Sequence, residues 1–395
     1  MKKIVIFTGG IETQGFFSLE LAKELKALGH PVYNFNLEYE EKSLAGLLRF
    51  VEKGNTVMLT FNFHGISGED IFVKDDGTLF WDEFHIPCVN IVVDHPLYYH
   101  HFLEKTPERY THVNIDRFHR AYMRECFPEI EASVFLPLAG TALAERPERE
   151  FEIVFTGNYT PPSRFEQYIT RLDDDYTAFY YGMIDDLLAH PSETLESVAK
   201  RHILQEIPEA TEEEVRSVFP NLTFIDLYIR FYERGKAVRT LVDAGLKVHV
   251  WGEGWDMLEC EHPENILRHG PADSLQCLQA IAKAKISLNV MPWFKDGAHD
   301  RVFNSCGNGA LCLSDKSLYL EEVLKDGEEV VYYDLNDMEA LPQIAADLLS
   351  SNSRREEIAE RGREKTLRAH LWKHRADVLH EIIEKGGKNG RFEFG

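Results

Sequence analysis

Two side chains that can move a proton follow one apolar run in the first third of the chain. Asp94 and His95 come directly after the run from Val89 to Val93, which has the composition of a buried parallel strand. The carboxyl ends of parallel strands line the ligand crevice of doubly wound sheets. The pair is therefore a candidate acid/base group. The alternative interpretation is that Asp94 caps a following helix or turn and that His95 is structural.

A second candidate site lies between Lys285 and Asp315. An apolar, partly β-branched run from Ile286 to Val290 predicts a strand, and a loop then leads to a short helix from Arg301 to Cys306. A second apolar run follows from Ala310 to Leu313. This order places the backbone N–H donors of a helix N-terminus at the mouth of a parallel sheet. Such a mouth is a natural site for a phosphorylated ligand.

The elements that must position these residues alternate between strand and helix. In the first part, strands are predicted at Lys3 to Phe7, Val32 to Leu37, Val57 to Phe61, Val89 to Val93 and Thr111 to Ile115, and helices at Phe16 to Leu28 and Ser43 to Glu52. Gly9 and Gly10 predict a tight turn after the first strand, and Gly29 caps the first helix. The pattern predicts a Rossmann-like domain over residues 1–141.

The second part of the chain repeats this alternation with an insertion. Residues 142–150 are polar, contain proline and predict a linker, after which Glu152 to Phe155 starts a new sheet. An acidic helical segment at about residues 163–224 predicts an inserted subdomain, and a strong helix follows from Leu227 to Ala244. A second Rossmann-like domain is thus predicted over residues 151–385, with a long terminal helix broken near His370 and a loose tail at residues 386–395.

Composition limits the classes of partner. With 395 residues, of which 44% are hydrophobic and 28% charged, the chain has the size of two domains and an ordinary globular composition. A net charge of −23 argues against broad binding of nucleic acids or anionic membranes. The six cysteines contain no C-x-x-C pair, and no run is long enough to span a bilayer, so free thiols and a cytoplasmic location are expected.

Two clusters resemble metal sites only superficially. His95, His100 and His101 lie close together but lack the i, i+4 spacing of a helical ligand pair. Asp173 and Asp175 form a D-x-D in a charged segment, which is typical of a solvated face. No metal site is predicted from either cluster.

The order of motifs in the second half resembles the C-terminal half of GT-B glycosyltransferases, and most of all their CgeB-like branch. The resemblance covers about residues 151–385 and is carried by several short segments: Val250 to Trp255, His269 to Pro271, Ala284 to Asn289, Arg301 to Asn304, Gly309 to Leu311, Tyr319 to Val323 and Asp326 to Val330. It implies two Rossmann-like domains that face a cleft and bind a nucleotide sugar in the C-terminal one.

The resemblance also implies roles for individual residues. The base and ribose are expected at Trp251, Gly252, Phe303 and Asn304, and the diphosphate at Gly157, Asn158, Arg230, Lys236, His299 and Arg301. A plain turn at residues 156–158 and charge pairing of the basic helix with the acidic insertion are the alternatives. Because such enzymes generally neutralise the diphosphate with a helix dipole and basic side chains, no metal or other cofactor is expected.

One departure from the family pattern concerns stereochemistry. Many retaining members place two glutamates eight positions apart, whereas the matching positions here are Asp296 and Asn304. Asn304 can still bind a ribose hydroxyl, because its amide both donates and accepts. Asp296 would hold the sugar in a retaining enzyme, whereas an inverting one would use Asp94 or His95 as base.

The resulting hypothesis is a metal-independent glycosyltransferase of the hexosyltransferase kind. Its donor would be a nucleotide sugar, UDP-linked, and its acceptor a protein or a cell-surface glycan. Two alternatives stay open: a nucleotide-sugar epimerase of the same fold, and a non-catalytic partner that binds nucleotide sugars. The second is motivated by Asp296 and Asn304.

Overall fold

The computed structural model describes residues 1–385, so the predicted tail at 386–395 lies outside the described residues. The chain divides into two compact units. Of the described residues, unit 1 contains Met1–Ala139 and residues 370–385, and unit 2 contains Gly140–Ala369. This division places residues 370–385 with unit 1, whereas the domain predicted from the sequence over 151–385 included them.

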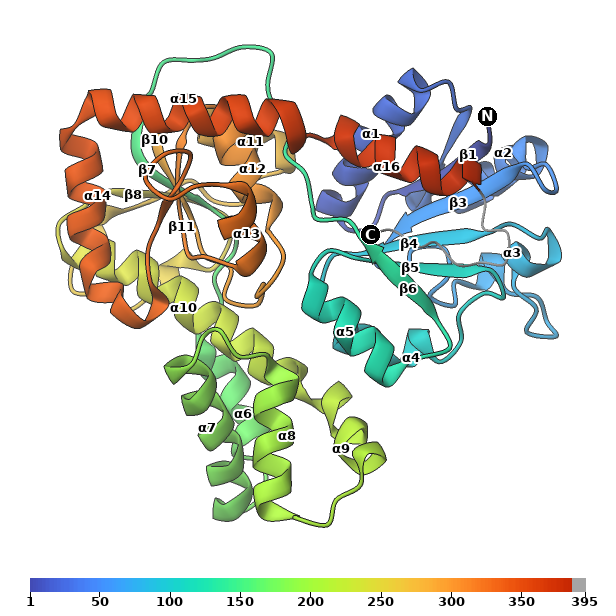
Figure 1. The fold of residues 1–395 in the computed structure, drawn as a ribbon, viewed down its shortest axis with the longest axis horizontal. Coiled ribbons are helices and arrows are strands. Elements are labelled where there is room, and N and C mark those ends of the chain that lie inside the picture. Colours follow the sequence, from blue (N-terminus) through green and yellow to red (C-terminus); the bar gives the residue numbers. More distant parts are fainter. Residues whose placement is uncertain (386–395) are drawn as a thin grey trace. The chain divides into compact units, whose positions relative to one another are not determined.

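Unit 1 is built on a six-stranded parallel sheet in the order β2-β1-β3-β4-β5-β6 (Figure 1). Its strands are β1 (Lys3–Thr8), β2 (Val32–Asn36), β3 (Thr56–Phe61), β4 (Cys88–Val92), β5 (Tyr110–Asn114) and β6 (Glu131–Phe135). Its α-helices are α1 (Glu12–Ala27), α2 (Glu40–Phe50), α3 (Phe80–Glu83), α4 (His100–Leu103), α5 (Arg117–Cys126) and α16 (Trp372–Lys385). Every residue of β3 and β4 is buried, as expected for a sheet covered on both faces.

Helix α16 closes unit 1 by packing on α1. The rings of Phe17 and Trp372 lie 5.1 Å apart, and the Trp372 ring also meets Phe61 of β3 edge-on at 6.2 Å. The guanidinium of Arg375 donates to the backbone carbonyls of Pro137 and Leu138, at 2.7 and 3.0 Å. The apolar face and the arginine of this last helix therefore complete the core of the first sheet.

Unit 2 has a six-stranded parallel sheet in the order β12-β11-β10-β7-β8-β9. Its strands are β7 (Phe151–Thr156), β8 (Val248–Trp251), β9 (Ile266–Arg268), β10 (Ala284–Asn289), β11 (Leu311–Ser314) and β12 (Val331–Tyr332). Its sheet-associated helices are α10 (Thr223–Asp243), α11 (Ser274–Ala282), α12 (Asp300–Gly307), α13 (Leu318–Val323), α14 (Leu341–Ser350) and α15 (Asn352–Ala369). The chain order reverses between β7 and β10, which is the switch point where such sheets bind ligands.

The predicted helical insertion extends from unit 2 between β7 and α10 (Figure 1). It contains α6 (Glu166–Ile169), α7 (Asp174–Ala189), α8 (Leu195–Glu206) and α9 (Glu212–Val218). Helix α9 begins with a capping box between Thr211 and Glu214, and Asp173 caps α7 by accepting from the Tyr176 N–H. The D-x-D acidic pair therefore marks a helix start.

The prediction of two parallel α/β domains with an inserted helical subdomain is confirmed. The break near His370 is also confirmed, since α15 ends at Ala369 and α16 begins at Trp372. Strand β6 was not predicted, because its short alternating pattern, Glu131 to Phe135, gives little signal by itself. Unit 1 also differs from unit 2 in its strand order, with the reversal between β1 and β3.

Candidate functional site

Arg301 lies at the switch point of the unit 2 sheet. Its Nη1 donates to Asn289 Oδ1 at the end of β10, at 2.8 Å, and its Nε donates to Thr156 Oγ1 at the end of β7, at 3.3 Å. The side chain is 6% exposed, and Nη2 lies 3.2 Å from the place that a Cβ on Gly157 would occupy. The guanidinium thus joins the two central strands at their carboxyl ends.

A second buried cation, Arg234 on α10, lies close to Arg301. Its Nη1 donates to the backbone carbonyl of Asn158, and its guanidinium carbon lies 5.5 Å from the Phe155 ring centroid. Arg301 lies 4.9 Å from the centroid of the same ring. The Nε of Arg234 is buried without a hydrogen-bond partner, although the residue is only 7% exposed. Burial of an incompletely satisfied guanidinium is costly, and an anion would offset that cost.

Arg230 and His299 complete this group of positive and polar side chains. Arg230 lies one turn before Arg234, with its guanidinium carbon 4.2 Å from the Trp293 ring centroid and its Nη2 3.2 Å from Asp226 Oδ2. His299 caps α12, since its Nδ1 accepts from the Arg301 N–H at 3.1 Å. We call Arg230, Arg234, His299 and Arg301 the arginine cluster.

The members of the arginine cluster repel one another. Burial lowers the pKa of Arg234 well below its usual value, and Arg301 and Arg230 lower it further. Burial also lowers the pKa of His299, with added repulsion from Arg301. Asp300 pairs with His299, Asp226 pairs with Arg230, and Asp315 also acts on Arg301. No carboxylate is among the groups that shift the pKa of Arg234, so a positive field remains around Arg234 beside the N-terminus of α12. Such a field is suited to a phosphorylated anion.

The turn after β7 packs tightly against the turn after β8. Gly157 donates its N–H to the Trp251 carbonyl at 2.8 Å, and Asn158 Oδ1 accepts from the Glu253 N–H at 2.9 Å. Gly252 has φ +135°, and a Cβ there would lie 2.4 Å from the Gly157 carbonyl oxygen, so only glycine fits. The Gly157 N–H and the Asn158 Oδ1 are thus engaged within the protein, which leaves their predicted donor contacts untested.

Trp251 lines a cavity of about 720 Å³ beside α11. Its ring stacks on His269 with centroids 3.8 Å apart and planes 1° from parallel, and it lies 5.2 Å from the Phe151 ring. Gln276 and Gln279 add amide groups to the same wall. A flat aromatic surface beside amide donors and acceptors can take a planar, polar ring.

Phe303 and Asn304 point into the protein from α12. Phe303 has no exposed surface, and a Cβ on Gly140 would meet its backbone at 2.6 Å. Asn304 Oδ1 accepts from the Thr141 N–H, and its Nδ2 donates to Asp300 Oδ2, both at 2.8 Å. These bonds tie the linker to α12, so a ribose contact by Asn304 would have to replace one of them; that role stays a prediction.

Asp296 and Lys236 are the remaining residues of unit 2 that were predicted to bind the donor. Asp296 is half-buried in the loop between β10 and α12. The Lys236 ammonium lies 5.9 Å from the Tyr232 ring centroid and acts on the carboxyl of Glu233, whose pKa burial raises and Lys236 lowers. The structure therefore brings together Arg230, His299 and Arg301, and adds Arg234 in the position expected for a second basic residue. The four-residue spacing between Arg230 and Arg234 is the feature of the sequence that could have indicated Arg234.

Behind the arginine cluster lie two buried acids that the sequence did not single out. Glu233 and Asp315 are each 2% exposed, and each has one oxygen, Oε2 and Oδ2, without a hydrogen-bond partner. Burial raises the pKa of each to about 7, and Glu233 adds to the rise at Asp315, whereas Lys295 opposes it. Glu233 directly precedes Arg234, so its charge state bears on the cluster.

Asp94 and His95 lie after β4 in unit 1. Asp94 Oδ2 accepts from Asn62 Nδ2 at 3.0 Å and from the Tyr99 hydroxyl at 3.2 Å. His95 is buried and caps the following turn, with its Nδ1 accepting from the Leu97 N–H at 3.1 Å. His100, which the sequence placed near them, pairs instead with the Tyr122 hydroxyl at 2.6 Å. The structural role considered for His95 is thus present, and its role as a base stays a prediction.

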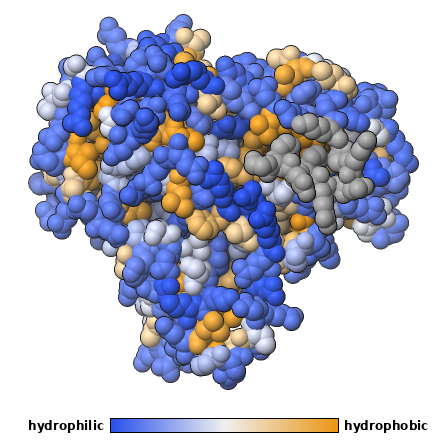
Figure 2. Space-filling view, viewed as in Figure 1, coloured by the Kyte–Doolittle hydropathy of each residue, from blue (hydrophilic) through white to orange (hydrophobic). Residues whose placement is uncertain are grey.

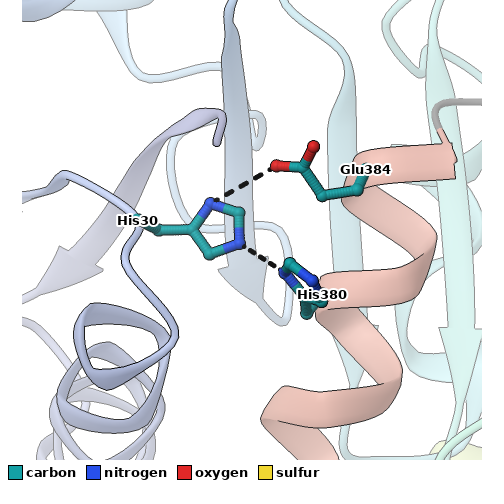
Figure 3. A group of neighbouring side chains, drawn as sticks. All are labelled: His30, His380 and Glu384. Atoms are coloured by element: carbon teal, nitrogen blue, oxygen red, sulfur yellow. Dashed lines mark hydrogen bonds and ion pairs between the residues drawn. The ribbon is translucent and has the colours of Figure 1, made fainter.

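Within the described residues, His30, His380 and Glu384 form the one group with the proximity of metal ligands (Figure 3). His30 Nδ1 lies 2.8 Å from the Lys2 carbonyl and Nε2 lies 2.8 Å from His380 Nδ1. Glu384 lies on the Nδ1 side of the ring and His380 on the Nε2 side (Figure 3). Glu384 and His380 both reach the His30 ring from α16, and the printed contacts of the group are those between its members and the contact with the Lys2 carbonyl. The group fits a hydrogen-bonded link from α16 to the start of the sheet.

Comparison with known proteins agrees with this architecture. Residues 234–381 match the family described as glycosyl transferase-like, and the match begins at Arg234. Similar solved structures include AviGT4, a glycosyltransferase involved in avilamycin A biosynthesis, with a TM-score of 0.53 at 12% identity, covering 98% of each chain. The fold is of the GT-B type. Within this fold, the strand order of unit 2 places the arginine cluster at the switch point of the sheet.

Two further structures share this fold. One is an alpha-glucosyltransferase in complex with UDP-glucose and DNA containing an abasic site, with a TM-score of 0.54, 13% identity and coverage of 97% of this chain and 99% of the other. The other is Anabaena Alr3699/HepE in complex with UDP and glucose, with a TM-score of 0.52, 8% identity and coverage of 97% and 100%. No curated protein matches the chain significantly in sequence.

Two further observations concern the hydropathy of the surface and the hydropathy of the helices. Hydrophilic residues cover most of the face shown in Figure 2, consistent with the acidic composition. Among residues 1–385, no helix combines the length and the hydropathy needed to cross a bilayer.

Proposed function

We propose that this protein is a glycosyltransferase that moves a hexosyl group from a nucleotide sugar, UDP-linked, to a protein or glycan acceptor. The observation that carries the proposal is the arginine cluster at the switch point of unit 2, where Arg234 and Arg301 are buried side by side and the Nε of Arg234 has no hydrogen-bond partner. The glycosyl transferase-like match, which starts at Arg234, supports it. Two structures of the same fold contain UDP with glucose, or UDP-glucose, which favours this donor class.

The chemistry follows from where charge develops. As the glycosidic bond to the diphosphate breaks, the sugar becomes oxocarbenium-like and negative charge grows on the leaving group. Buried guanidinium groups already aimed at that position stabilise the transition state without reorganisation. Arg234 and Arg301 supply this charge, Arg230 adds to it, and the N-terminus of α12 lies beside them. In this proposal side chains neutralise the leaving group, so no metal is required.

The remaining assignments belong to the same proposal. The Trp251 cavity takes the base, because its stacked rings and the Gln276 and Gln279 amides match a planar polar ligand. Asp94 or His95 in unit 1 supplies the base if the reaction inverts, and Asp296 holds the sugar if it retains. We also propose that the protein belongs to the CgeB-like branch and that it acts in the cytoplasm.

A panel of nucleotide sugars tests the proposal. The intact protein is incubated with each donor, with and without EDTA, and products are separated by chromatography. We expect slow hydrolysis to nucleoside diphosphate with one donor class, unchanged by EDTA. Interconversion of sugars without hydrolysis would instead indicate an epimerase, and binding without turnover would indicate a non-catalytic partner. Failure to bind any nucleotide sugar would contradict the assignment of the arginine cluster.

A further inference from the structure

A second cationic region lies at the opposite end of the unit 2 sheet. A cavity of about 350 Å³ opens between the linker, the start of β10 and helix α15. Lys285, which lines it, is the second residue of β10, whereas Asn289, which holds Arg301, is the last. At about 3.3 Å per residue the two positions are roughly 13 Å apart along the strand. The cavity is therefore separate from the arginine cluster.

The lining of this cavity is unusually basic for so acidic a chain. Four cationic residues line it, against two carboxylates on α15, Glu356 and Glu360; the cations are Arg146, Arg149, Lys285 and Arg355. The whole chain carries a net charge of −23. A local excess of positive charge in a concave site attracts small anions.

Two of the guanidinium groups converge over one glycine. Gly309 has φ +70°, and a Cβ there would lie 2.8 Å from Arg149 Nη2 and 3.1 Å from Arg146 Nη2. Arg149 is fixed by bonds to the carbonyls of Ala282, Asn308 and Gly309. Burial lowers its pKa, and the charges of Arg146 and Arg355 lower it further, as expected for cations gathered in one place without enough counter-charge.

The other basic groups can still reorient toward a ligand. Arg146 pairs with Glu360 at 2.7 Å, but both side chains are more than two-fifths exposed, so this pair holds the arginine weakly. Lys285 forms no ion pair with a carboxylate of the described residues. A fixed arginine, a movable arginine and a lysine around one cavity match the donors that hold a phosphate group.

We propose that this cavity binds a small phosphorylated ligand carrying one or two phosphate groups. The ligand lies in the cavity beside the guanidinium groups that cover Gly309, where Arg149 contributes a fixed positive charge and Arg146 and Lys285 donate to the phosphate. The volume of about 350 Å³ corresponds to about twelve water molecules at roughly 30 Å³ each, which suits a diphosphate or a sugar phosphate. Bound there, the anion ties the linker to α15 and to the end of α12. The inference does not depend on the proposed activity.

Calorimetry with the intact protein tests this site, with inorganic phosphate, pyrophosphate and glucose 1-phosphate as separate probes at constant ionic strength. Each titration is repeated in an Arg234→Ala protein, so that binding at the arginine cluster is removed. We expect one site to persist in that protein. Lys285→Ala and Arg146→Ala should each weaken it about tenfold, the size of one charge-assisted contact. Lys247→Ala, an exposed lysine of unit 2 outside the cavity, is the matched control and should leave affinity unchanged.

A variant with the opposite sign separates ligand binding from a structural role. Glu356 lines the cavity and partly offsets the charge on Arg149. Glu356→Gln should therefore tighten binding of the same probe several-fold, with the fold checked by circular dichroism. Loss of all phosphate binding in the Arg234→Ala protein, or equal affinity in the Lys285→Ala, Arg146→Ala and Glu356→Gln proteins, would overturn the proposal. The probe that binds most tightly identifies the ligand as free phosphate, diphosphate or sugar phosphate.

Discussion

The carboxyl ends of the two parallel sheets carry polar groups of opposite character. In unit 1 they satisfy one another: Asn62 donates to Asp94 and accepts from the Val93 N–H, and His95 caps the next turn. In unit 2, Arg234 and Arg301 are buried beside each other, and burial and mutual repulsion lower the pKa of Arg234. Similar architecture thus yields an edge whose polar groups bond to one another in unit 1 and an edge with adjacent buried cations in unit 2. The uncompensated charge, rather than the fold, marks the ligand site.

Removing the buried guanidinium whose Nε has no hydrogen-bond partner should have the largest effect on binding. Arg234→Ala is expected to weaken nucleoside diphosphate affinity about a hundredfold, because a charge-assisted contact in a desolvated site is lost. Affinity for the free nucleoside should change little. Calorimetry with both ligands measures the difference, and Arg239→Ala on the same helix is the control, since that side chain contacts the Glu259 carbonyl instead. Equal losses of affinity for the nucleoside and for the nucleoside diphosphate would show that Arg234 does not contact the diphosphate. The contrast drawn between the carboxyl ends of the two sheets would then be wrong.

The buried acids behind the cluster predict a pH dependence of stability. Burial raises the pKa of Glu233 from 4.5 to about 7, so its contribution is fully present below pH 4.5 and is lost as pH rises through 7. The free energy of unfolding should fall by the order of 2 kcal/mol between pH 5 and pH 8.

Glu233→Gln should reduce the pH dependence of the free energy of unfolding, and Asp315→Asn should reduce it as well. Urea unfolding at several pH values measures it, with Glu339→Gln as a surface control. If the wild-type protein is equally stable at pH 5 and pH 8, both carboxyl groups are more exposed to water than the structure shows.

A substitution of Asn304 tests whether α12 contributes to ligand binding at the carboxyl end of the unit 2 sheet. Asn304→Ala removes the bond to the Thr141 N–H and should lower the free energy of unfolding by about 1 kcal/mol. If the amide also binds ribose, affinities for nucleoside and nucleoside diphosphate should fall together by a similar factor. Unchanged nucleoside affinity, measured by calorimetry on the folded variant, would assign Asn304 to the linker contact alone.

The smallest effect on donor binding is expected in unit 1. Asp94→Asn preserves the shape of the side chain and should leave nucleotide-sugar affinity unchanged, because in the proposal the edge of the unit 1 sheet carries no part of the diphosphate contact. Turnover should fall strongly only if Asp94 acts as base. Donor binding and turnover are measured on one preparation, with Asp70→Asn as control. A large loss of donor affinity would contradict the separation of the two edges.

Much of the architecture could be predicted from local pattern. Apolar runs predicted the strands at residues 57–61 and 286–290 within two residues, and polar composition predicted the insertion before α10. Arg301 could be placed at a helix start because His299 and Asp300 precede an apolar periodic segment. The four-residue spacing of Arg230 and Arg234 also indicates that they share one face of a helix.

Contacts between distant segments could not be predicted in this way. The effect of Glu233 on the pKa of Asp315 depends on α10 lying near the end of β11. The Phe155 ring that Arg234 and Arg301 share depends on packing between distant segments in the same way. Phe303 looked like a ligand contact from its motif, but its ring is fully buried. Residues 370–385 follow unit 2 in the chain and yet pack on α1 of unit 1.

The sequence alone determined the alternation of strands and helices, the turns that require glycine, and the set of basic residues in an acidic chain, since these depend on neighbours within a few positions. Tertiary structure decided which of those residues are buried, which charges remain uncompensated, and which pKa values move. The physical reason is that desolvation and charge pairing depend on distances across the fold, and these are set only when β7, β10, β11 and α10 pack together.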